Sequence, residues 1–429
     1  MRIVLLARGT RGDVQPMVVL AAELRRRGHE VLLGASPNLV NFAVQAGVDA
    51  RPVGPDFHAF LQSAEGQTLL ASSNTKKLTS GLANLARIHL EQTHRELLQI
   101  VDRAEMIVAS LLLAEHAASI AEAKRIPVVL IQFAPLGRTR NYPAFPLTTR
   151  HLGGLLNLLT WTLFDRIVWK AIACDINRVR TWLGLPAVRA RLSNRTEGKR
   201  VLQIQAFSAK IVPGISDYGV NQPIVGFFAP SEEDRRAFGE SALDPELESW
   251  LSAGQAPAYF GFGSMPVGNL PVYVQMIEQV TQRLGLRALV SAGWSDLRGC
   301  SRSNGDLRVV GVLNHDAVLP RCRVAIHHGG AGTTAASISA GLPTLVCSLT
   351  ADQPFWGAQL ARLGAGAHIR FAALDAARLE HGLRQLMRPE ATERARALAD
   401  AMRNESNAVS RAAELIEARS GKSATQAGA

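Results

Sequence analysis

Residues 324–334 of this 429-residue chain read VAIHHGGAGTT, and this stretch carries the clearest structural signal in the sequence. Apolar residues 324–327 predict a buried strand, and the small residues after the glycines predict a helix over 331–340. Glycines let a backbone approach a ligand closely, while the free N–H groups and the dipole of a new helix attract a phosphate. No lysine follows the glycines, so the loop is not a Walker motif. A tight turn with a packed histidine is the alternative interpretation.

A second polar motif follows the next predicted strand, residues 343–347. Asp352 and Gln353 place a carboxylate and an amide beyond the carboxyl end of that strand, where doubly wound sheets bind their ligands. Both groups suit the hydroxyls of a sugar. Because a proline follows at position 354, the pair also fits the start of a helix. The residues alone leave both interpretations open.

The rest of the chain alternates short apolar runs with helical patterns, which predicts crossover units and parallel sheets in two doubly wound α/β halves. The predicted strands span residues 2–7, 30–35, 106–110, 127–133, 223–228, 256–261, 287–291, 307–310, 324–327 and 343–347. The predicted helices span 115–124, 272–284, 331–340 and 353–363, with a long amphipathic segment over 75–104 and one or two charged helices within 389–419.

Composition excludes several classes of protein. The net charge of +11 comes from 47 basic and 36 acidic residues. The basic residues are scattered rather than clustered, so we expect no nucleic-acid partner. The four cysteines form no CxxC pair, which argues against a zinc site and indicates a reducing, cytoplasmic setting. The N-terminus lacks a signal-peptide pattern, and the longest uncharged run is centred on HHGGAGTT, so we expect no transmembrane helix.

Six segments together resemble the nucleotide-sugar-dependent glycosyltransferases of the GT-B fold. The resemblance is strongest to the branch that includes sterol and lipid glucosyltransferases and bacterial antibiotic and glycolipid glycosyltransferases. It covers nearly the whole chain. The segments are GTRGDVQP at 9–16, FGFGSMP at 260–266, SAGW at 291–294, GVLNHDAVLPR at 311–321, HHGGAGTTAASISAGLP at 327–343 and TADQPFW at 350–356.

The resemblance implies two Rossmann-like doubly wound domains that face a central cleft. Residues 1–230 would form the acceptor-binding domain and residues 231–400 the sugar-nucleotide-binding domain. Residues 401–419 would form a helix that crosses back to the first domain. The short, small and polar tail over 420–429 predicts disorder.

The resemblance also assigns the donor site. His327 matches the position whose imidazole contacts the donor diphosphate, and Asp352 and Gln353 match the pair that holds hydroxyls of the sugar. Val312 stands where plant members carry a tryptophan that stacks on uracil, so the expected donor is a UDP- or TDP-sugar. The other matched positions are Gly329, Gly330, Ala331, Gly332 and Thr333 in the phosphate loop, and Ser264 and Trp294 in the crevice.

The chemistry is assigned to the first glycine loop. Where many plant members carry a histidine as base, this chain has Asp13, as in the sterol-type branch, with Thr10 beside it. A partly desolvated carboxylate can take the proton of an acceptor hydroxyl. Asp13 also fits the start of a helix, and the residues alone do not separate the two roles.

Metal and cofactor are not expected. No two aspartates are separated by a single residue, so the DxD metal clamp of the other major glycosyltransferase fold is absent from the sequence. The leaving diphosphate would be stabilised by the helix dipole, backbone N–H groups and His327. The predicted reaction is inverting transfer of a hexose to a hydroxyl of a lipophilic small molecule, natural product or glycolipid.

The acceptor site is the least determined part. Phe57, His58, Tyr142 and Phe145 are the predicted acceptor-binding residues. The apolar stretch over 151–172 fits core, an acceptor wall, or a patch for peripheral contact with the inner membrane face.

Two other functions compete with this one. A nicotinamide or flavin oxidoreductase would carry an acidic ribose-binding residue about 20 positions after the glycine loop, and the end of the strand predicted over 30–35 offers none. A non-catalytic sugar-nucleotide-binding or scaffold protein stays open, although the carboxylate of Asp13 argues against it.

Overall fold

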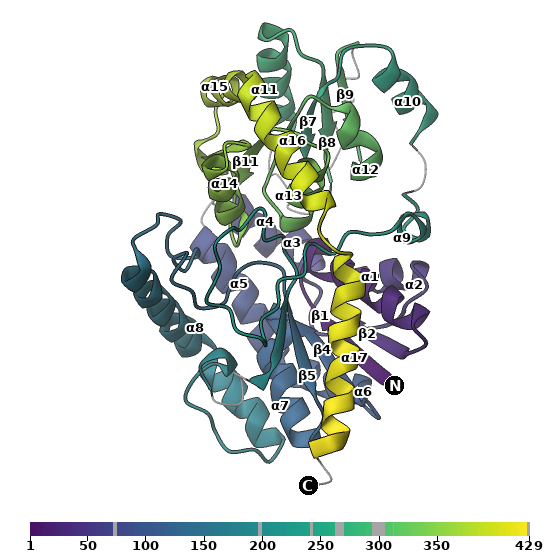
Figure 1. Ribbon diagram of the computed structural model, residues 1–429, viewed down its shortest axis with the longest axis vertical. Helices are drawn as coiled ribbons and strands as arrows, with labels where there is room; N and C mark the ends of the chain where they lie inside the picture. Colours follow the sequence, from purple (N-terminus) through teal and green to yellow (C-terminus); the bar gives the residue numbers. More distant parts are fainter. Residues whose placement is uncertain are drawn as a thin grey trace. The chain divides into compact units, whose positions relative to one another are not determined.

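The computed structural model describes residues 1–71, 75–195, 200–240, 243–261, 270–293, 305–311 and 313–426 (Figure 1). The chain divides into two compact units. The first unit comprises residues 1–209, 213–238 and 406–429, and the second comprises residues 210–212 and 239–405. Each unit has its own parallel sheet, which confirms the predicted α/β architecture.

The described strands of the first unit lie in the order β3-β2-β1-β4-β5-β6, all parallel. They are β1 (Arg2–Ala7), β2 (Glu30–Ala35), β3 (Asp49–Pro52), β4 (Met106–Ser110), β5 (Val128–Gln132) and β6 (Leu202–Gln205). The helices around them are α1 (Arg11–Arg26), α2 (Val40–Gln45), α3 (Phe57–Gln62), α4 (Ala64–Ala71), α5 (Thr75–Ile88), α6 (Leu90–Ile100), α7 (Ala114–Lys124), α8 (Gly154–Trp182), α9 (Glu232–Ala237) and α17 (Ala408–Gln426).

The second unit repeats the plan, with described strands in the order β12-β11-β10-β7-β8-β9. Its strands are β7 (Ala258–Gly261), β8 (Ala288–Ser291), β9 (Leu307–Val310), β10 (Val324–His327), β11 (Thr344–Ser348) and β12 (Gly366–Arg370). Its helices are α10 (Pro245–Ser252), α11 (Leu270–Arg283), α12 (His315–Val318), α13 (Ala331–Ser339), α14 (Gln353–Arg362), α15 (Ala376–Leu386) and α16 (Pro389–Arg403).

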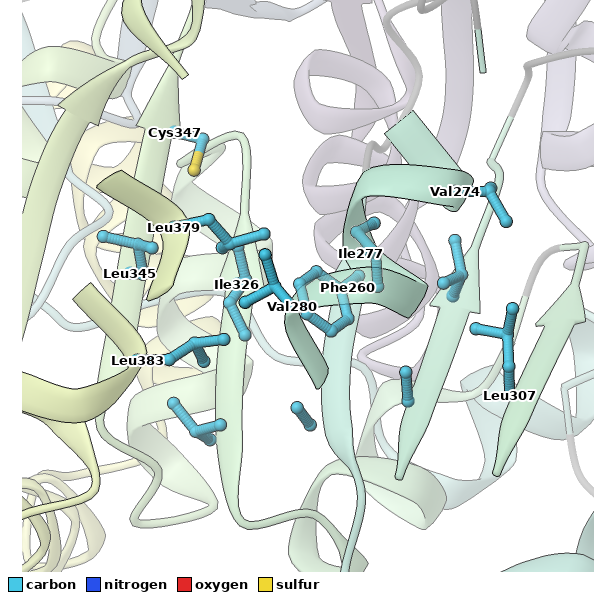
Figure 2. Packing of buried hydrophobic residues seen from close by; sticks show 14 of the residues in the cluster. Phe260, Val274, Ile277, Val280, Leu307, Ile326, Leu345, Cys347, Leu379 and Leu383 are labelled. Carbon is cyan, nitrogen blue, oxygen red and sulfur yellow. The ribbon is translucent and has the colours of Figure 1, made fainter. Parts of the chain in front are cut away.

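Helices cover both faces of each sheet, so the interior strands are continuous apolar runs rather than alternating ones. In the second unit, Phe260 of β7, Ile326 of β10 and Leu345 of β11 lie on one face. Figure 2 shows Ile277 and Val280 of α11 near Phe260, in the same cluster as Ile326 and Leu345. Because this face is packed from strand to strand, the carboxyl ends of β7, β10 and β11 are held at one edge of the sheet.

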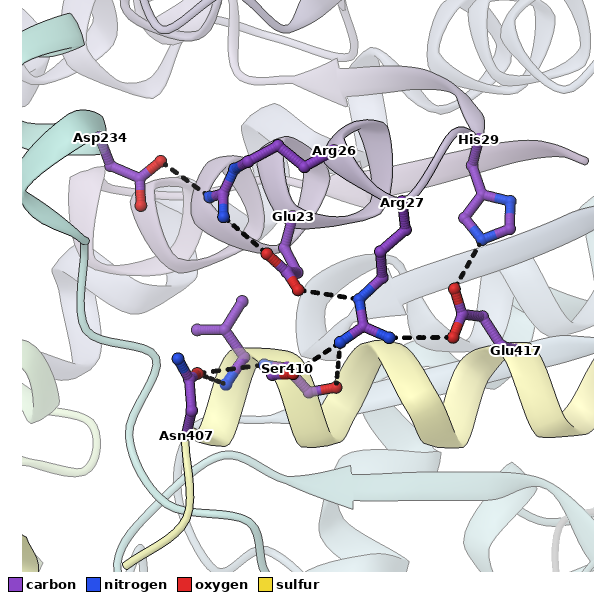
Figure 3. A network of polar contacts seen from close by, with 9 residues as sticks. Glu23, Arg26, Arg27, His29, Asp234, Asn407, Ser410 and Glu417 are labelled. Atoms are coloured by element: carbon purple, nitrogen blue, oxygen red, sulfur yellow. Dashed lines mark hydrogen bonds and ion pairs between the residues drawn. The ribbon is translucent and has the colours of Figure 1, made fainter.

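A helix from the far end of the chain completes the first unit. Apolar residues of α17, including Ala412, Ala413 and Ile416, are buried, and the helix packs on α1. Arg27, the C-cap of α1, holds it in place (Figure 3): its guanidinium donates to Ser410 Oγ at 2.6 Å and to Glu417 at 3.1 Å.

The remaining contacts of this network bind α1 and the following strand to the same helix. The Arg27 Nε also donates to Glu23 at 2.8 Å, and His29 contacts the other oxygen of Glu417 at 3.0 Å. Hydrogen bonds to Glu23 and the charges of Glu23 and Glu417 raise the pKa of Arg27. The guanidinium therefore stays charged in this contact.

The structure differs from the sequence expectations mainly at sheet edges. The edge strands β3, β6 and β12 were not predicted. The strand predicted over 223–228 is reduced to one bridge between Gln205 and Ile224, because Pro223 has no N–H to donate and Gly226 turns at a φ of +104°. The amphipathic segment 75–104 is two helices that meet at His89, and α17 includes residues 420–426 of the tail predicted to be disordered.

Within the part of the chain that the structure describes, every helix is too short or too polar to span a bilayer.

We expect Arg27→Ala to lower the free energy of unfolding by about 1–3 kcal/mol, because it leaves Glu417 and Ser410 without their charged donor. Urea denaturation followed by circular dichroism measures the change. Arg411→Ala, on α17, removes only an exposed ion pair with Glu414 and should change the free energy of unfolding by less than about 0.5 kcal/mol. Equal losses in the two variants would contradict a specific clamp at Arg27.

Candidate functional site

The loop between β10 and α13 is shaped by its glycines. Gly329 has a φ of +90°, and a Cβ there would lie 2.4 Å from Val346 of β11. A Cβ on Gly330 would lie 2.6 Å from Nε2 of His328. Gly330 is the N-cap of α13 and provides no side-chain cap, so the first N–H groups of the helix, over 331–333, point to a ligand or to water.

His327 lies inside this loop rather than at its surface. Its side chain is 2% exposed, its Nδ1 accepts from the N–H of Gly329 at 3.0 Å, and its Nε2 contacts Ser337 Oγ at 3.2 Å. Both ring nitrogens are therefore used within the unit, and burial holds the pKa of His327 well below its ordinary range. This arrangement differs from the expectation that the His327 ring contacts a diphosphate.

His328, the next residue, is only half-buried. Its Nδ1 has no hydrogen-bond partner among the described residues, and neither does Oγ1 of Thr334 on α13. Burial lowers the pKa of His328 to about 4, so the ring is neutral near pH 7. A neutral imidazole whose nitrogen has no partner can hydrogen-bond an oxyanion.

Asp352 and Gln353 begin α14 after a strained turn. Ala351 has a φ of +59°, which is unusual for a residue with a side chain. Gln353 Oε1 accepts from the N–H groups of Leu349 and Thr350 at 2.7 and 3.2 Å. Asp352 Oδ2 accepts from Trp356 Nε1 at 2.7 Å, and burial raises the pKa of Asp352.

Asp352 and Gln353 therefore offer different groups to a ligand. The amide oxygen of Gln353 holds the turn, so its NH₂ group is the part that can donate to a hydroxyl. The hydrogen bond from Trp356 uses one carboxylate oxygen of Asp352 and fixes the direction of the other. A rigid acceptor beside a rigid donor suits the hydroxyls of a sugar.

In the first unit, Asp13 lies against the loop that follows β1. Its Oδ2 accepts from the N–H of Thr10 at 2.8 Å and from the Thr10 hydroxyl at 3.1 Å. Gly9 has a φ of +133°, and a Cβ there would lie 2.2 Å from the same oxygen. Asp13 therefore caps the start of α1, and the loop holds its carboxylate in one place.

The predicted acceptor-binding residues do not share one setting. Phe57 lies at the start of α3 beneath the guanidinium of Arg8, at 5.7 Å, and His58 contacts Gln62 at 3.2 Å. Tyr142 and Phe145 are buried instead. The Tyr142 hydroxyl donates to the carbonyl of Pro213. The backbone carbonyl of Tyr142 accepts from Trp161 Nε1, so this segment is attached to α8. Ser264, Trp294 and Val312 lie outside the described residues.

Two domain families match the chain. Residues 3–143 match the glycosyltransferase family 28 N-terminal domain, and residues 293–419 match the erythromycin biosynthesis protein CIII-like C-terminal domain. An uncharacterized glycosyltransferase of Mycobacterium tuberculosis is 34% identical over 97% of this chain and 98% of its own length. The chain belongs to this family of glycosyltransferases.

Other proteins similar to the glycosyltransferase are also named as glycosyltransferases. A sterol 3-beta-glucosyltransferase of Arabidopsis thaliana is 29% identical, with 94% of this chain and 63% of the relative covered. The solved glycosyltransferase of kitacinnamycin has a TM-score of 0.71 at 19% identity and 98% coverage of both chains. Glycosyltransferase VinC, solved with dTDP, has a TM-score of 0.67 at 16% identity over 97% of this chain and 99% of its own. These structures share the GT-B fold with the glycosyltransferase.

Neither His328 nor Arg8 is among the site residues predicted from the sequence. Strand alternation could have found His328, because a residue that follows a buried strand-terminal histidine turns to the opposite side. Arg8 is a charged residue directly after an apolar strand, which is itself a signal for a group at the ligand-binding edge of a parallel sheet.

The two histidines should respond differently to substitution. A nucleoside diphosphate at 100 times its dissociation constant should stabilise the wild type by about 2.7 kcal/mol. His328→Ala should remove most of that stabilisation and change the unliganded protein little. His327→Ala should cost about 1–3 kcal/mol without ligand, because it leaves the buried N–H of Gly329 without its acceptor.

Thermal shifts with UDP and TDP on both variants measure the two effects. A full ligand-induced shift in His328→Ala would show that the diphosphate does not use this ring.

Proposed function

We propose that the protein is an inverting glycosyltransferase that moves a hexose from a UDP- or TDP-sugar to a hydroxyl of a lipophilic acceptor. The main support is the phosphate loop, where the first N–H groups of α13 have no side-chain cap and one ring nitrogen of His328 has no partner among the described residues. The family supplies the reaction class, and the loop supplies donors for a leaving diphosphate.

The donor is held by groups of the second unit. N–H groups over 331–333 and the ring of His328 bind the diphosphate, while Asp352 and Gln353 bind hydroxyls of the sugar. His327 fixes the shape of the loop from within. Because these donors stabilise the negative charge of the leaving group, transfer requires no metal ion and no further cofactor.

Asp13 is the base of the proposed reaction. As the acceptor oxygen forms its bond to the anomeric carbon, its proton passes to the Asp13 carboxylate. The bond from that carbon to the diphosphate oxygen breaks, and its electron pair leaves with the nucleotide. Capping of Thr10 does not conflict with this role, since it orients the carboxylate that receives the proton.

We further propose peripheral contact with an anionic membrane surface through α8. Its outer face exposes apolar side chains at four-residue spacing, whereas Trp161 on the inner face is buried. The exposed fractions are 73% for Leu155, 53% for Leu156, 60% for Leu159, 53% for Leu163 and 50% for Ile167. An apolar stripe of this kind suits a helix that lies in the plane of a membrane interface.

The charges of α8 support an anionic surface in particular. Arg166, Lys170 and Arg178 are exposed, and none of them forms an ion pair within the described residues. Both aspartates of the helix are paired with arginines of the same unit: Asp165 with Arg191 and Asp175 with Arg87. The outer face is therefore apolar and cationic, which complements anionic lipid headgroups.

Asp13→Asn tests the proposed base. The amide oxygen can still accept from Thr10, so folding and donor binding should persist, while kcat falls roughly 100- to 10,000-fold. The assay uses UDP- and TDP-sugars with lipophilic alcohols in the presence of a chelator, with products identified by mass spectrometry and their anomeric configuration by NMR.

The matched control is Asp244→Asn, which changes an ordinary helix cap at the start of α10 and should leave kcat unchanged. A near wild-type kcat in Asp13→Asn would place the base elsewhere. Donor binding by the wild type without transfer to any alcohol would favour the scaffold alternative, and activity that needed added magnesium or manganese would contradict the metal-free mechanism.

The α8 face predicts binding to vesicles. The wild type should co-sediment with vesicles rich in phosphatidylglycerol more than with pure phosphatidylcholine, and salt should weaken the binding. Leu159→Glu combined with Leu163→Glu should weaken it at least about tenfold, because two apolar anchors are lost. Val272→Glu changes an exposed apolar residue of α11 in the other unit and should not. Equal sedimentation of all three proteins would contradict the proposed surface.

A further inference from the structure

Arg8 is a cation without a counterion at the carboxyl edge of the first sheet. It follows β1 directly and is half-buried. One Nη donates to the carbonyl of Leu112 at a long 3.4 Å, and its Nε has no partner. No ion pair of the described residues includes Arg8, and burial lowers its pKa to about 10. A desolvated guanidinium in this state favours an anion that supplies the missing charge.

A second unused donor lies beside it. Thr93 of α6 is 1% exposed, and its Oγ1 has no partner among the described residues. A Cβ on Gly54 would lie 3.2 Å from that hydroxyl and 3.4 Å from Cδ of Arg8. The Thr93 hydroxyl and the Arg8 side chain therefore both lie beside Gly54, which has no side chain of its own. Such unpaired buried groups call for a ligand or ordered water.

One carboxylate lies near this pair: Glu96 accepts from the N–H of Gly54 at 2.7 Å, and it forms no ion pair with Arg8. His94 and His116 contact each other at 3.1 Å. Burial, with help from His94 and Arg8, lowers the pKa of His116 to about 3, and burial also lowers that of His94. Two neutral rings cannot balance the guanidinium. Phe57, at 5.7 Å from the Arg8 guanidinium carbon, adds an apolar surface to the same place.

We propose that Arg8 and Thr93 bind an oxyanion, a carboxylate or a phosphate, carried by the acceptor. The acceptor is then an amphiphile with three parts: a hydroxyl to receive the sugar, an apolar chain and an anionic group. This inference rests on the proposed function. Arg8 precedes Gly9, on which the Asp13 carboxylate lies, so one loop presents the base for the hydroxyl and the cation for the anionic group.

Matched acceptors test the inference. We expect the wild type to glycosylate a 3-hydroxy fatty acid with a kcat/KM about 10- to 100-fold above that for its methyl ester, the usual worth of a charged hydrogen bond. Arg8→Gln should remove that preference by lowering kcat/KM on the acid toward the value for the ester. Arg8→Lys should restore part of it, since lysine keeps the charge and loses the forked geometry. A diol monophosphate in place of the acid distinguishes phosphate from carboxylate.

Controls keep this test separate from the proposed function. Arg95→Gln removes an exposed cation from the same helix as Thr93 and should retain the preference. Calorimetric binding of decanoate, which has no hydroxyl to react, should weaken in Arg8→Gln and not in Arg95→Gln. Equal use of acid, phosphate and ester by the wild type would overturn the inference and leave the function standing. Failure to glycosylate any alcohol, with decanoate still bound through Arg8, would overturn the function alone.

Discussion

The parallel pairing of strands determines where chemistry can occur in this protein. All described strand pairs of both sheets are parallel, so each chain crossover returns to the amino edge and every loop after a strand lies at the carboxyl edge. Arg8 and Asp13 follow β1, His328 follows β10, and Asp352 follows β11. The functional groups are spread along the sequence, yet in each unit the sheet brings them to one edge.

Burial explains which parts of the fold could be predicted. Strands β1, β2, β4, β9 and β10 have the predicted bounds. For β1, β4 and β10 the reason is burial, because a strand covered on both faces is apolar along most of its length. Three of the four edge strands were missed. The β3 sequence DARP and the β6 sequence LQIQ are short and partly polar, and their pairing depends on a neighbouring strand that local sequence does not reveal. Tertiary context decided these elements.

The candidate site shows the same division. The roles drawn from residue types stay predictions: a glycine loop for phosphate, an Asp-Gln pair for hydroxyls and a carboxylate in the first loop as base. Which of two adjacent histidines turns inward was not predicted from composition or motif. Ala325 and His327 are on the face of β10 that packs toward α13, whereas Ile326 packs on the opposite face. The direction of a side chain depends on this alternation, so a shift of one residue moves a histidine from one face of the sheet to the other.

The clamp between Arg27 and α17 has a consequence for biosynthesis. The surface of α1 that α17 covers is made within the first 30 residues, but its cover is made only after the whole second unit. During translation the surface of α1 that α17 later covers is therefore exposed while about 170 further residues fold into a separate domain. The apolar residues of α1 that α17 covers therefore stay exposed in the nascent chain until α17 itself has been made.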